Sequence, residues 1–138
     1  MNPDIFKAQA AFIQAMGQTK QPGDRHNVLL YGSLVDEECG ELYMALREWA
    51  ITGSLTEAAD VLKEAIDLIY VTAGLVNAMG FDGMAAFREV HRSNMSKLGP
   101  NGKPVRRKDG KILKGPDYSP ADMMPIVMSA IQNQKENA

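Results

Sequence analysis

The sequence predicts an all-α protein: a bundle of four helices, followed by a short basic hairpin and a C-terminal helix. Apolar residues recur at helical spacing in four successive segments that reach about residue 95. Capping and helix-ending residues separate these segments, and the short connections favour antiparallel neighbours. With 138 residues, 45% of them hydrophobic, the chain suits a single domain with one core.

The first two helices are separated by a polar loop. Residues 2–4, Asn-Pro-Asp, are typical of a helix start, and Gly17 ends the apolar pattern that follows. A second pattern runs from about residue 27 to about residue 50, with Leu30 and Trp49 on its apolar stripe.

A third helix is expected after Gly53. Residues 54–57, Ser-Leu-Thr-Glu, match a capping box, in which Ser54 bonds forward to the N–H of Glu57 and Glu57 reaches back. This helix is predicted to continue to about residue 79, where Gly80 ends it.

The last third of the chain changes character. Asp82 is expected to cap a fourth helix, after which residues 97–118 lack helical periodicity and form a basic loop. Within it, Asp109-Gly110 predicts a tight two-residue hairpin. Residues 119–138 are expected to hold a tail helix with Pro125 in its first turn.

Other features bound the class of protein. The single cysteine, Cys39, excludes an internal disulfide, and the N-terminus lacks the basic segment and apolar core of a secretory signal. No apolar run approaches the roughly 20 residues of a membrane span. We therefore expect a cytoplasmic protein with no membrane partner.

The basic residues are concentrated in one stretch. Residues 97–114 contain seven lysines or arginines and one acid, a charge of +6; the whole chain carries −2, so the remainder carries −8. Two such regions are able to complement a single ligand. The basic stretch has no aromatic residue to stack on bases and belongs to an acidic chain, which argues against nucleic acid as the partner.

Acidic residues interrupt the apolar stripes of the second and third helices. At about 100° per residue, Glu38 and Glu41 fall inside one stripe, with Glu37 at its edge, while Glu64 and Asp67 fall within or beside the other. Ionised carboxylates in apolar surroundings require cations. Lysine or arginine could supply the charge, or the acids could be solvated. Two pairs at i, i+3 on antiparallel helices converge on one volume, however, which favours a metal ion.

The donor types indicate Mg²⁺ or Mn²⁺. Neither acidic segment contains a histidine, and zinc and copper prefer nitrogen or sulfur ligands. Because Mg²⁺ usually completes its coordination with water and substrate phosphates, the sequence predicts a phosphorylated ligand and a hydrolytic reaction.

These residues resemble the EExxE…ExxD signature of the all-α nucleotide pyrophosphohydrolases, a superfamily that includes MazG, the phosphoribosyl-ATP pyrophosphohydrolases and the dimeric dUTPases. The matching residues are 37–41 (EECGE) and 64–67 (EAID). Residues 91–97 (HRSNMSK) and 114–116 (KGP) add a likeness to small bacterial and phage MazG-like proteins. The likeness extends from the first helix to about residue 124.

The resemblance implies cleavage of a nucleoside triphosphate between its α- and β-phosphates, which yields a monophosphate and pyrophosphate. It also implies two or three Mg²⁺ or Mn²⁺ ions per site, and a homodimer or homotetramer with sites at the subunit interface. Within this group the expected substrates are dUTP or a purine such as dGTP, in a bacterial or phage-infected cytoplasm.

On this basis Glu38, Glu41, Glu64 and Asp67 are the expected principal metal ligands. Glu37 is expected to position or deprotonate the attacking water, or to contact a further metal ion.

Phosphate contacts are expected in the basic stretch. Asn94 and Lys97 could hold β- and γ-phosphate oxygens, with Lys114 or Arg106 and Arg107 closing over them. The alternative is a helix cap followed by solvated hairpin charges.

Base contacts are expected from three residues. Asn77 could read a base edge, or serve as a cap or interface residue. Phe12 and Trp49 could stack on a base, or belong to the core. Glycines inside helices predict close approach of another helix or of substrate, and three are present: Gly32, Gly40 and Gly74.

A second hypothesis belongs to another class of protein. The chain could be a non-catalytic, metal-dependent helical module that binds nucleic acid or nucleotide through residues 97–114. Metal-dependent release of pyrophosphate from a triphosphate distinguishes the two hypotheses.

Overall fold

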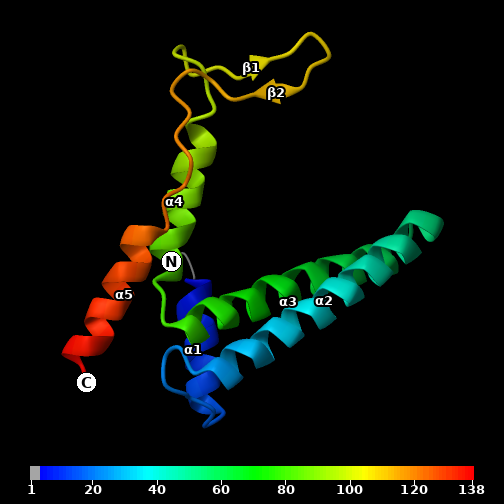
Figure 1. The fold of residues 1–138 in the computed structure, drawn as a ribbon. Coiled ribbons are helices and arrows are strands. Elements are labelled where there is room, and N and C mark those ends of the chain that lie inside the picture. Colours follow the sequence, from blue (N-terminus) through cyan, green and yellow to red (C-terminus); the bar gives the residue numbers. More distant parts are fainter. Residues whose placement is uncertain (1–3) are drawn as a thin grey trace. The chain divides into compact units, whose positions relative to one another are not determined.

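The computed structural model describes residues 4–138, which form five helices and one two-stranded hairpin (Figure 1). The predicted all-α class is therefore confirmed. The chain divides into two compact units, one that ends at Phe81 and one that spans Asp82–Ala138. No single helix among these residues is long and apolar enough to cross a membrane, although the helices Leu55–Met79 and Gly83–Met95 taken together meet that test by length and composition.

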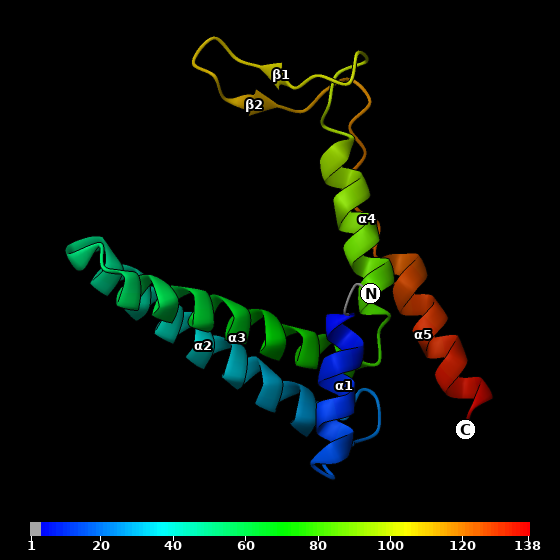
Figure 2. The same cartoon turned by 180° about the vertical axis from the view of Figure 1, so that it is seen from behind.

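The N-terminal unit consists of α1 (Ile5–Ala15), α2 (Arg25–Thr52) and α3 (Leu55–Met79). The two long helices, α2 and α3, form an antiparallel hairpin and pack along their length (Figures 1 and 2). The short helix α1 packs against α3. Its N-cap is Asp4, whose carboxylate accepts the N–H of Phe6 at 3.0 Å. The expected cap at Asn2-Pro3 lies outside the described residues.

Local rules account for the turn between α2 and α3. Gly53 and Gly80 end the two helices with left-handed φ values of 60° and 81°. The Ser54 hydroxyl accepts the N–H of Glu57 at 3.1 Å, as predicted. The reciprocal half of the capping box was predicted wrongly, because the N–H of Ser54 donates to the hydroxyl of Thr52 at 3.2 Å instead.

The core of the N-terminal unit is thin. Its buried apolar residues are Tyr31, Ala73 and Ala78. Leu30 and Trp49, predicted on the apolar stripe of α2, are 51% and 45% exposed. Two antiparallel helices meet along one narrow line, so an apolar stripe wider than that line stays exposed. The core expected along α2 is thus formed only in part.

The C-terminal unit contains α4 (Gly83–Met95), β1 (Val105–Arg106), β2 (Ile112–Leu113) and α5 (Met124–Glu136). Asp82 caps α4 by accepting the N–H of Ala85 at 2.9 Å. Pro125 lies in the first turn of α5. Both features agree with the sequence analysis.

The loop of the β1–β2 hairpin is longer than predicted. Arg107 and Lys111 are joined by a backbone hydrogen bond of 2.8 Å, which leaves three residues between them. Gly110 has a φ of 88°, and its N–H donates to the carbonyl of Arg107 at 2.9 Å. A two-residue type I′ turn would need a positive φ at Asp109 as well, whereas the three-residue loop needs it only at the glycine.

The segment after the hairpin returns along the end of α4. The N–H of Gly115 donates to the carbonyl of Lys97, and the N–H of Ser119 donates to the hydroxyl of Ser96, both at 2.9 Å. A Cβ atom on Gly115 would lie 2.5 Å from the carbonyl oxygen of Leu98. Glycine is therefore required where the two segments meet.

Candidate metal centre

Three glutamates from two helices converge in the N-terminal unit. Glu38 and Glu41 lie about 60° apart on α2, and Glu64 lies on α3. Glu41 precedes the turn at Gly53 by about as many residues as Glu64 follows it, so the antiparallel hairpin places them at the same height. Each glutamate offers a carboxylate oxygen, and these oxygens lie within 4.8 Å of one another. This grouping confirms that the two acidic segments meet.

Two oxygens of this cluster lack a hydrogen-bond partner. Glu38 Oε2 and Glu64 Oε2 are buried and unbonded within the described residues. An unpaired buried carboxylate oxygen is unfavourable, because it has lost water without gaining a donor. A bound divalent cation would satisfy both atoms, and oxygen donors are what Mg²⁺ and Mn²⁺ prefer. The residues present therefore fit the metal ions that the sequence predicts.

The pKa values of two glutamates indicate an excess of negative charge in this cluster. Burial raises the pKa of Glu38, and repulsion from Asp67 and then Glu64 raises it further. The pKa of Glu41 is also raised, first by the charge of Glu38 and then by its contact with Glu64. Both shifts are what burial and mutual repulsion within a cluster of carboxylates produce.

Asp67 stands beside this cluster, in contact with a lysine. Lys63 Nζ lies 2.8 Å from Asp67 Oδ2 and 2.9 Å from Glu64 Oε1. These two bonds raise the pKa of the Lys63 ammonium, the bond to Asp67 having the larger effect. This role of Lys63 was not predicted, although its i, i+4 spacing to Asp67 is a sequence pattern that indicates an ion pair. Part of the expected counter-charge is therefore supplied by the protein itself.

Glu37 is exposed and does not belong to the group of three converging glutamates. It neighbours Glu38 in the chain and contributes to the raised pKa of both Glu38 and Glu41.

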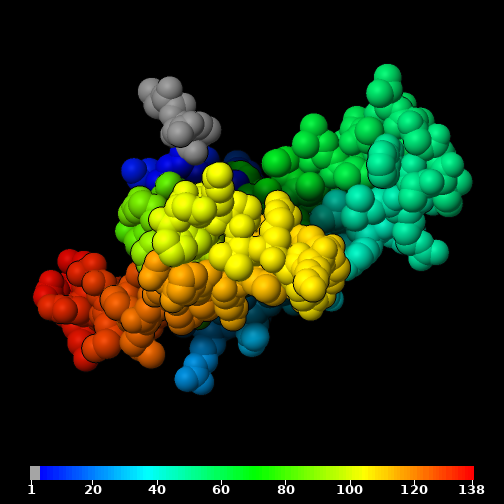
Figure 3. Space-filling model, turned by 90° about the horizontal axis from the view of Figure 1, so that it is seen from above, coloured from blue at the N-terminus to red at the C-terminus, as the bar shows by residue number. Residues whose placement is uncertain are grey.

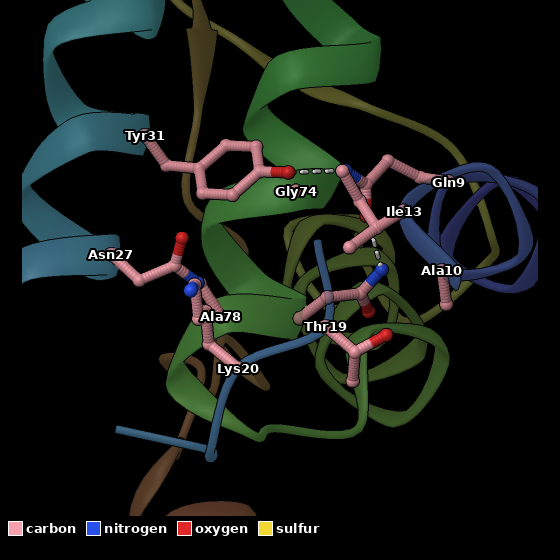
Figure 4. Close-up of a pocket in the computed structure, with 10 residues that line it drawn as sticks. Gln9, Ala10, Ile13, Thr19, Lys20, Asn27, Tyr31, Gly74 and Ala78 are labelled. Carbon is pink, nitrogen blue, oxygen red and sulfur yellow. Dashed lines mark hydrogen bonds between the residues drawn. The ribbon is translucent and has the colours of Figure 1, made fainter. Parts of the chain in front are cut away.

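A cavity lined by residues of α1, α2 and α3 lies one helical turn from two of the predicted ligands. Its volume is about 370 Å³, and its lining includes Leu34 and Val71, each four residues from a predicted ligand, Glu38 or Asp67. A smaller cavity of about 130 Å³ shares part of this lining and is shown in Figure 4. The cavities hold several polar side chains besides apolar ones, among them Gln9, Asn27 and Lys20.

A buried network of three polar side chains borders these cavities. Gln9 is 2% exposed, and its amide donates to the hydroxyl of Tyr31 and accepts from the amide of Asn77, both at 2.8 Å. The ring of Tyr31 passes over Gly74 (Figure 4), where a Cβ atom would lie 2.1 Å from the ring. Of the helical glycines singled out in the sequence, Gly74 thus has the predicted close approach. Around Gly32 and Gly40, apart from the adjoining residues and the nearby backbone of α2 itself, no atom of the described residues lies within 4 Å of the equivalent position.

The three predicted base-binding residues occupy different places. Phe12 lines the larger cavity and Asn77 the smaller one. Asn77 also donates to the carbonyl of Phe6 at 2.8 Å, which fastens α1 to α3. Trp49 lies toward the other end of α2 and lines neither cavity. Gln9 and Tyr31 were not predicted, because nothing in the local sequence marks them.

The predicted phosphate-binding residues lie in the C-terminal unit. Lys97 Nζ donates to Asn94 Oδ1 at 2.9 Å, and the backbone bond from Gly115 to Lys97 places Lys114 next to this pair in the fold. Lys114 Nζ lies 4.5 Å from the ring centre of Tyr118.

The two arginines of the hairpin have partners within it. Arg107 pairs with the carboxylate of Asp109, and Arg106 donates to the carbonyl of Gly110 at 3.1 Å.

The fold and the site together define an all-α protein with a carboxylate centre suited to divalent cations. The chain belongs to the phosphoribosyl-ATP pyrophosphohydrolase family, whose model matches residues 10–94. This match covers more than half of the chain and every predicted metal ligand, and it confirms the resemblance found in the sequence. Membership of a pyrophosphohydrolase family supports the prediction that the protein is a hydrolase.

Similar chains occur among solved structures. One of them is a crystal structure of a candidate NTP pyrophosphohydrolase from Exiguobacterium sp. 255-15, with 20% sequence identity, a TM-score of 0.45 and 100% coverage of both chains. No curated protein matches.

Proposed function

We propose that the protein is a Mg²⁺- or Mn²⁺-dependent nucleoside triphosphate pyrophosphohydrolase. It would cleave a deoxynucleoside triphosphate such as dGTP or dUTP to the monophosphate and pyrophosphate. The observation that carries this proposal is the convergence of Glu38, Glu41 and Glu64, with two buried carboxylate oxygens that lack a partner. Membership of the family supports the reaction class.

The proposed metal ligands are Glu38, Glu41, Glu64 and Asp67. Bound Mg²⁺ or Mn²⁺ would neutralise phosphate charge and lower the pKa of a bound water. The exposed position of Glu37 beside this cluster suits it to hold or accept the proton of the attacking water.

The proposed step is an in-line displacement. A water oxygen forms a bond to the α-phosphorus, and the bond from that phosphorus to the oxygen bridging to the β-phosphorus breaks. Pyrophosphate leaves with the electron pair, and the proton of the water passes to a carboxylate, for which Glu37 is the candidate. The protein's part is to hold charges in place before the reaction begins.

The larger cavity is the proposed nucleoside site. It begins one helical turn from Glu38 and Asp67, and Phe12 and Tyr70 give it aromatic walls. Gln9 lines both cavities and Asn77 lines the smaller one, and their amide groups are able to bond with a base edge. Asn94, Lys97 and Lys114 are the proposed phosphate contacts; Arg106 and Arg107 are second choices because each has a partner in the hairpin.

Self-association is also proposed. Along α3, apolar residues fall within about 60° of one another on the side away from Glu64. The four are Leu55, Leu62, Ile66 and Ile69, with exposed fractions of 90%, 64%, 50% and 49%. An exposed apolar stripe of this length is typical of an interface, and a homodimer or homotetramer would cover it.

A triphosphate panel tests the reaction. The common dNTPs and NTPs are incubated with Mg²⁺ or Mn²⁺, and pyrophosphate release is measured. We expect at least one deoxynucleotide to be hydrolysed, with no release when the metal is chelated. Failure to release pyrophosphate from any of them would remove the enzyme proposal in favour of a non-catalytic module.

Substitutions test the ligand set. Glu38→Gln and Asp67→Asn should each lower kcat/KM by about 100-fold or more, since each removes a negative charge that would hold the metal ion. Glu48→Gln is the matched control, because Glu48 is an exposed acid on α2 outside the cluster. Activity retained in either ligand variant would show that the assignment is wrong.

Labelled water tests the position of cleavage. In H₂¹⁸O, attack at the α-phosphorus places the label in the monophosphate, whereas attack at the β-phosphorus places it in pyrophosphate. We expect the label in the monophosphate.

A further inference from the structure

Lys63 binds one edge of the candidate metal centre. Its ammonium contacts Glu64 Oε1 at 2.9 Å and Asp67 Oδ2 at 2.8 Å. The side chain of Lys63 is 62% exposed, that of Asp67 is 40% exposed, and that of Glu64 is 15% exposed. The lysine therefore approaches the acids from the solvent side.

Lys63 forms hydrogen bonds only with the solvent-facing carboxylate oxygens of this centre. Glu64 has its Oε1 bonded to Lys63, while its Oε2 is buried without a partner. Glu38 Oε2 is likewise buried and unbonded. The centre is thus divided into an inner part, formed by Glu38, Glu41 and Glu64, and an outer part, formed by Glu64 and Asp67.

A metal ion and Lys63 are unable to share the outer part. A divalent cation bound to Glu64 Oε1 and Asp67 Oδ2 would lie about 2.0–2.1 Å from each oxygen if it were Mg²⁺. The ammonium already occupies the space between those oxygens, and two cations at such close range repel each other. The inner part has no such occupant among the described residues.

We propose that Lys63 competes with divalent cations for the outer part of the centre and must leave before an ion can use Asp67. The inference rests on the proposed metal centre. It predicts sequential loading: the first ion binds to the inner glutamates with Lys63 in place, and a later ion binds at Asp67 only by displacing the lysine. Displacement is feasible because exposed ion pairs are weak and the lysine stem is flexible.

The test compares Mn²⁺ binding in the wild type and in Lys63→Met by isothermal titration calorimetry. Removal of the competitor should tighten the weaker class of Mn²⁺ sites by about 3- to 30-fold, as expected for the loss of two exposed ion pairs. Lys63→Arg keeps the charge and should behave as the wild type. Arg47→Met is the matched control, because Arg47 lies exposed on α2 and makes no ion pair within residues 4–138.

Thermal unfolding provides a second readout. Metal-free Lys63→Met should melt below the metal-free wild type, because Glu64 and Asp67 lose their neutralising partner. With saturating Mn²⁺ the two proteins should melt at the same temperature, since the ion has replaced the lysine in both. Lys63→Gln, which keeps a polar side chain of similar length, serves if the methionine variant does not fold.

The outcomes separate the two proposals. If the wild type and Lys63→Met bind Mn²⁺ equally, the competition is refuted while the metal centre stands. If Lys63→Met loses the same stability with and without Mn²⁺, the competition is also refuted, and Lys63 has only a structural role. If neither protein binds Mn²⁺, the metal centre fails and this inference fails with it. Tightening in Arg47→Met as large as in Lys63→Met would assign the effect to net charge and refute the specific role.

Discussion

At the scale of single residues, the C-terminal unit contains a carboxylate whose pKa is shifted in the opposite direction from those of the candidate metal centre. Glu89 accepts hydrogen bonds from Arg92 Nε at 2.8 Å, from Arg92 Nη2 at 2.7 Å and from the N–H of Asp122 at 2.9 Å. Arg92 is the main cause that lowers the pKa of Glu89 to about 2, and the N–H of Asp122 adds to it. Glu89 thus joins α4 to the segment that precedes α5.

This shift predicts an acid-sensitive contribution to stability. The unfolded chain holds a proton on Glu89 below a pKa of 4.5, whereas the folded chain takes it up only near 2. The stabilisation from Glu89 is therefore present above pH 4.5 and is lost as the pH falls from about 4.5 towards 2.

Urea unfolding between pH 7 and pH 3 measures this effect. Glu89→Gln should be less stable than the wild type at pH 7, and the difference should shrink as the pH falls. Asp117→Asn, at an exposed acid in the same unit, should show little change. A Glu89→Gln deficit that stays constant with pH would contradict the assignment.

The pKa shifts of the acids in the candidate metal centre have the opposite direction. Burial and mutual repulsion raise the pKa values of Glu38 and Glu41, so protonation is easier in the folded state. The sequence predicted the convergence of these residues because helical spacing and a short turn are local properties. The contact of Lys63 with the acids was not predicted, because a lysine on a helix surface is able either to extend into solvent or to bind neighbouring carboxylates. The rotamer that the folded surroundings favour decides between the two.

At the scale of elements, Gly74 sets how closely α2 approaches α3. A Cβ atom at this position would lie 2.1 Å from Tyr31 Cε1 and 2.7 Å from Gln9 Nε2. Tyr31 therefore lies against the backbone of α3, and its hydroxyl reaches Gln9 on α1. One glycine allows three helices to meet through two side chains.

We predict that Gly74→Ala lowers the free energy of unfolding by about 1–3 kcal/mol, because the added methyl group overpacks this contact. Gly32→Ala is the matched control, since its added methyl group has no neighbour within 4 Å among the described residues outside the adjoining residues and the nearby backbone of α2. The control should raise stability by up to about 1 kcal/mol, the usual preference of a helix for alanine. Urea unfolding measures both, and a Gly74→Ala protein as stable as the control would rule out the close contact.

Two element predictions failed for reasons of local geometry. The Asp109-Gly110 pair was expected to form a two-residue turn, but Asp109 does not take the positive φ which that turn requires. The capping box at Ser54 is formed in one direction only, because the N–H of Ser54 donates to the hydroxyl of Thr52 instead. In both cases the residue types indicated a turn or a cap correctly, and the competing backbone geometry decided its form.

At the scale of the whole molecule, exposed apolar surface is the main feature that lacks an intramolecular explanation. The stripe Leu55–Ile69 on α3 leads from the turn of the α2–α3 hairpin, whose exposed end is teal in Figure 3. Because α3 uses its other side to meet α2 and to present Glu64, the stripe is free to bind a second copy of the chain.

We predict that the protein sediments as a dimer or tetramer and that Leu62→Glu combined with Ile66→Glu shifts it to the monomer. A buried charge at an apolar interface is strongly unfavourable, so two such changes should weaken association by at least about 100-fold. Ile112→Glu, at a hairpin residue that is 54% exposed, is the control and should not alter the assembly. Sedimentation velocity measures all three, and a monomeric wild type would refute the interface.

The sequence by itself determined the helices, their caps and the acidic residues that meet. Asp82, Gly53 and Gly80 act through φ values and hydrogen bonds within a few residues, so their effect is readable from the chain alone. Only the tertiary structure decided the buried position of Gln9 and the exposure of the stripe on α3. Each of these depends on which side chains from distant segments share one volume, and no local rule specifies that.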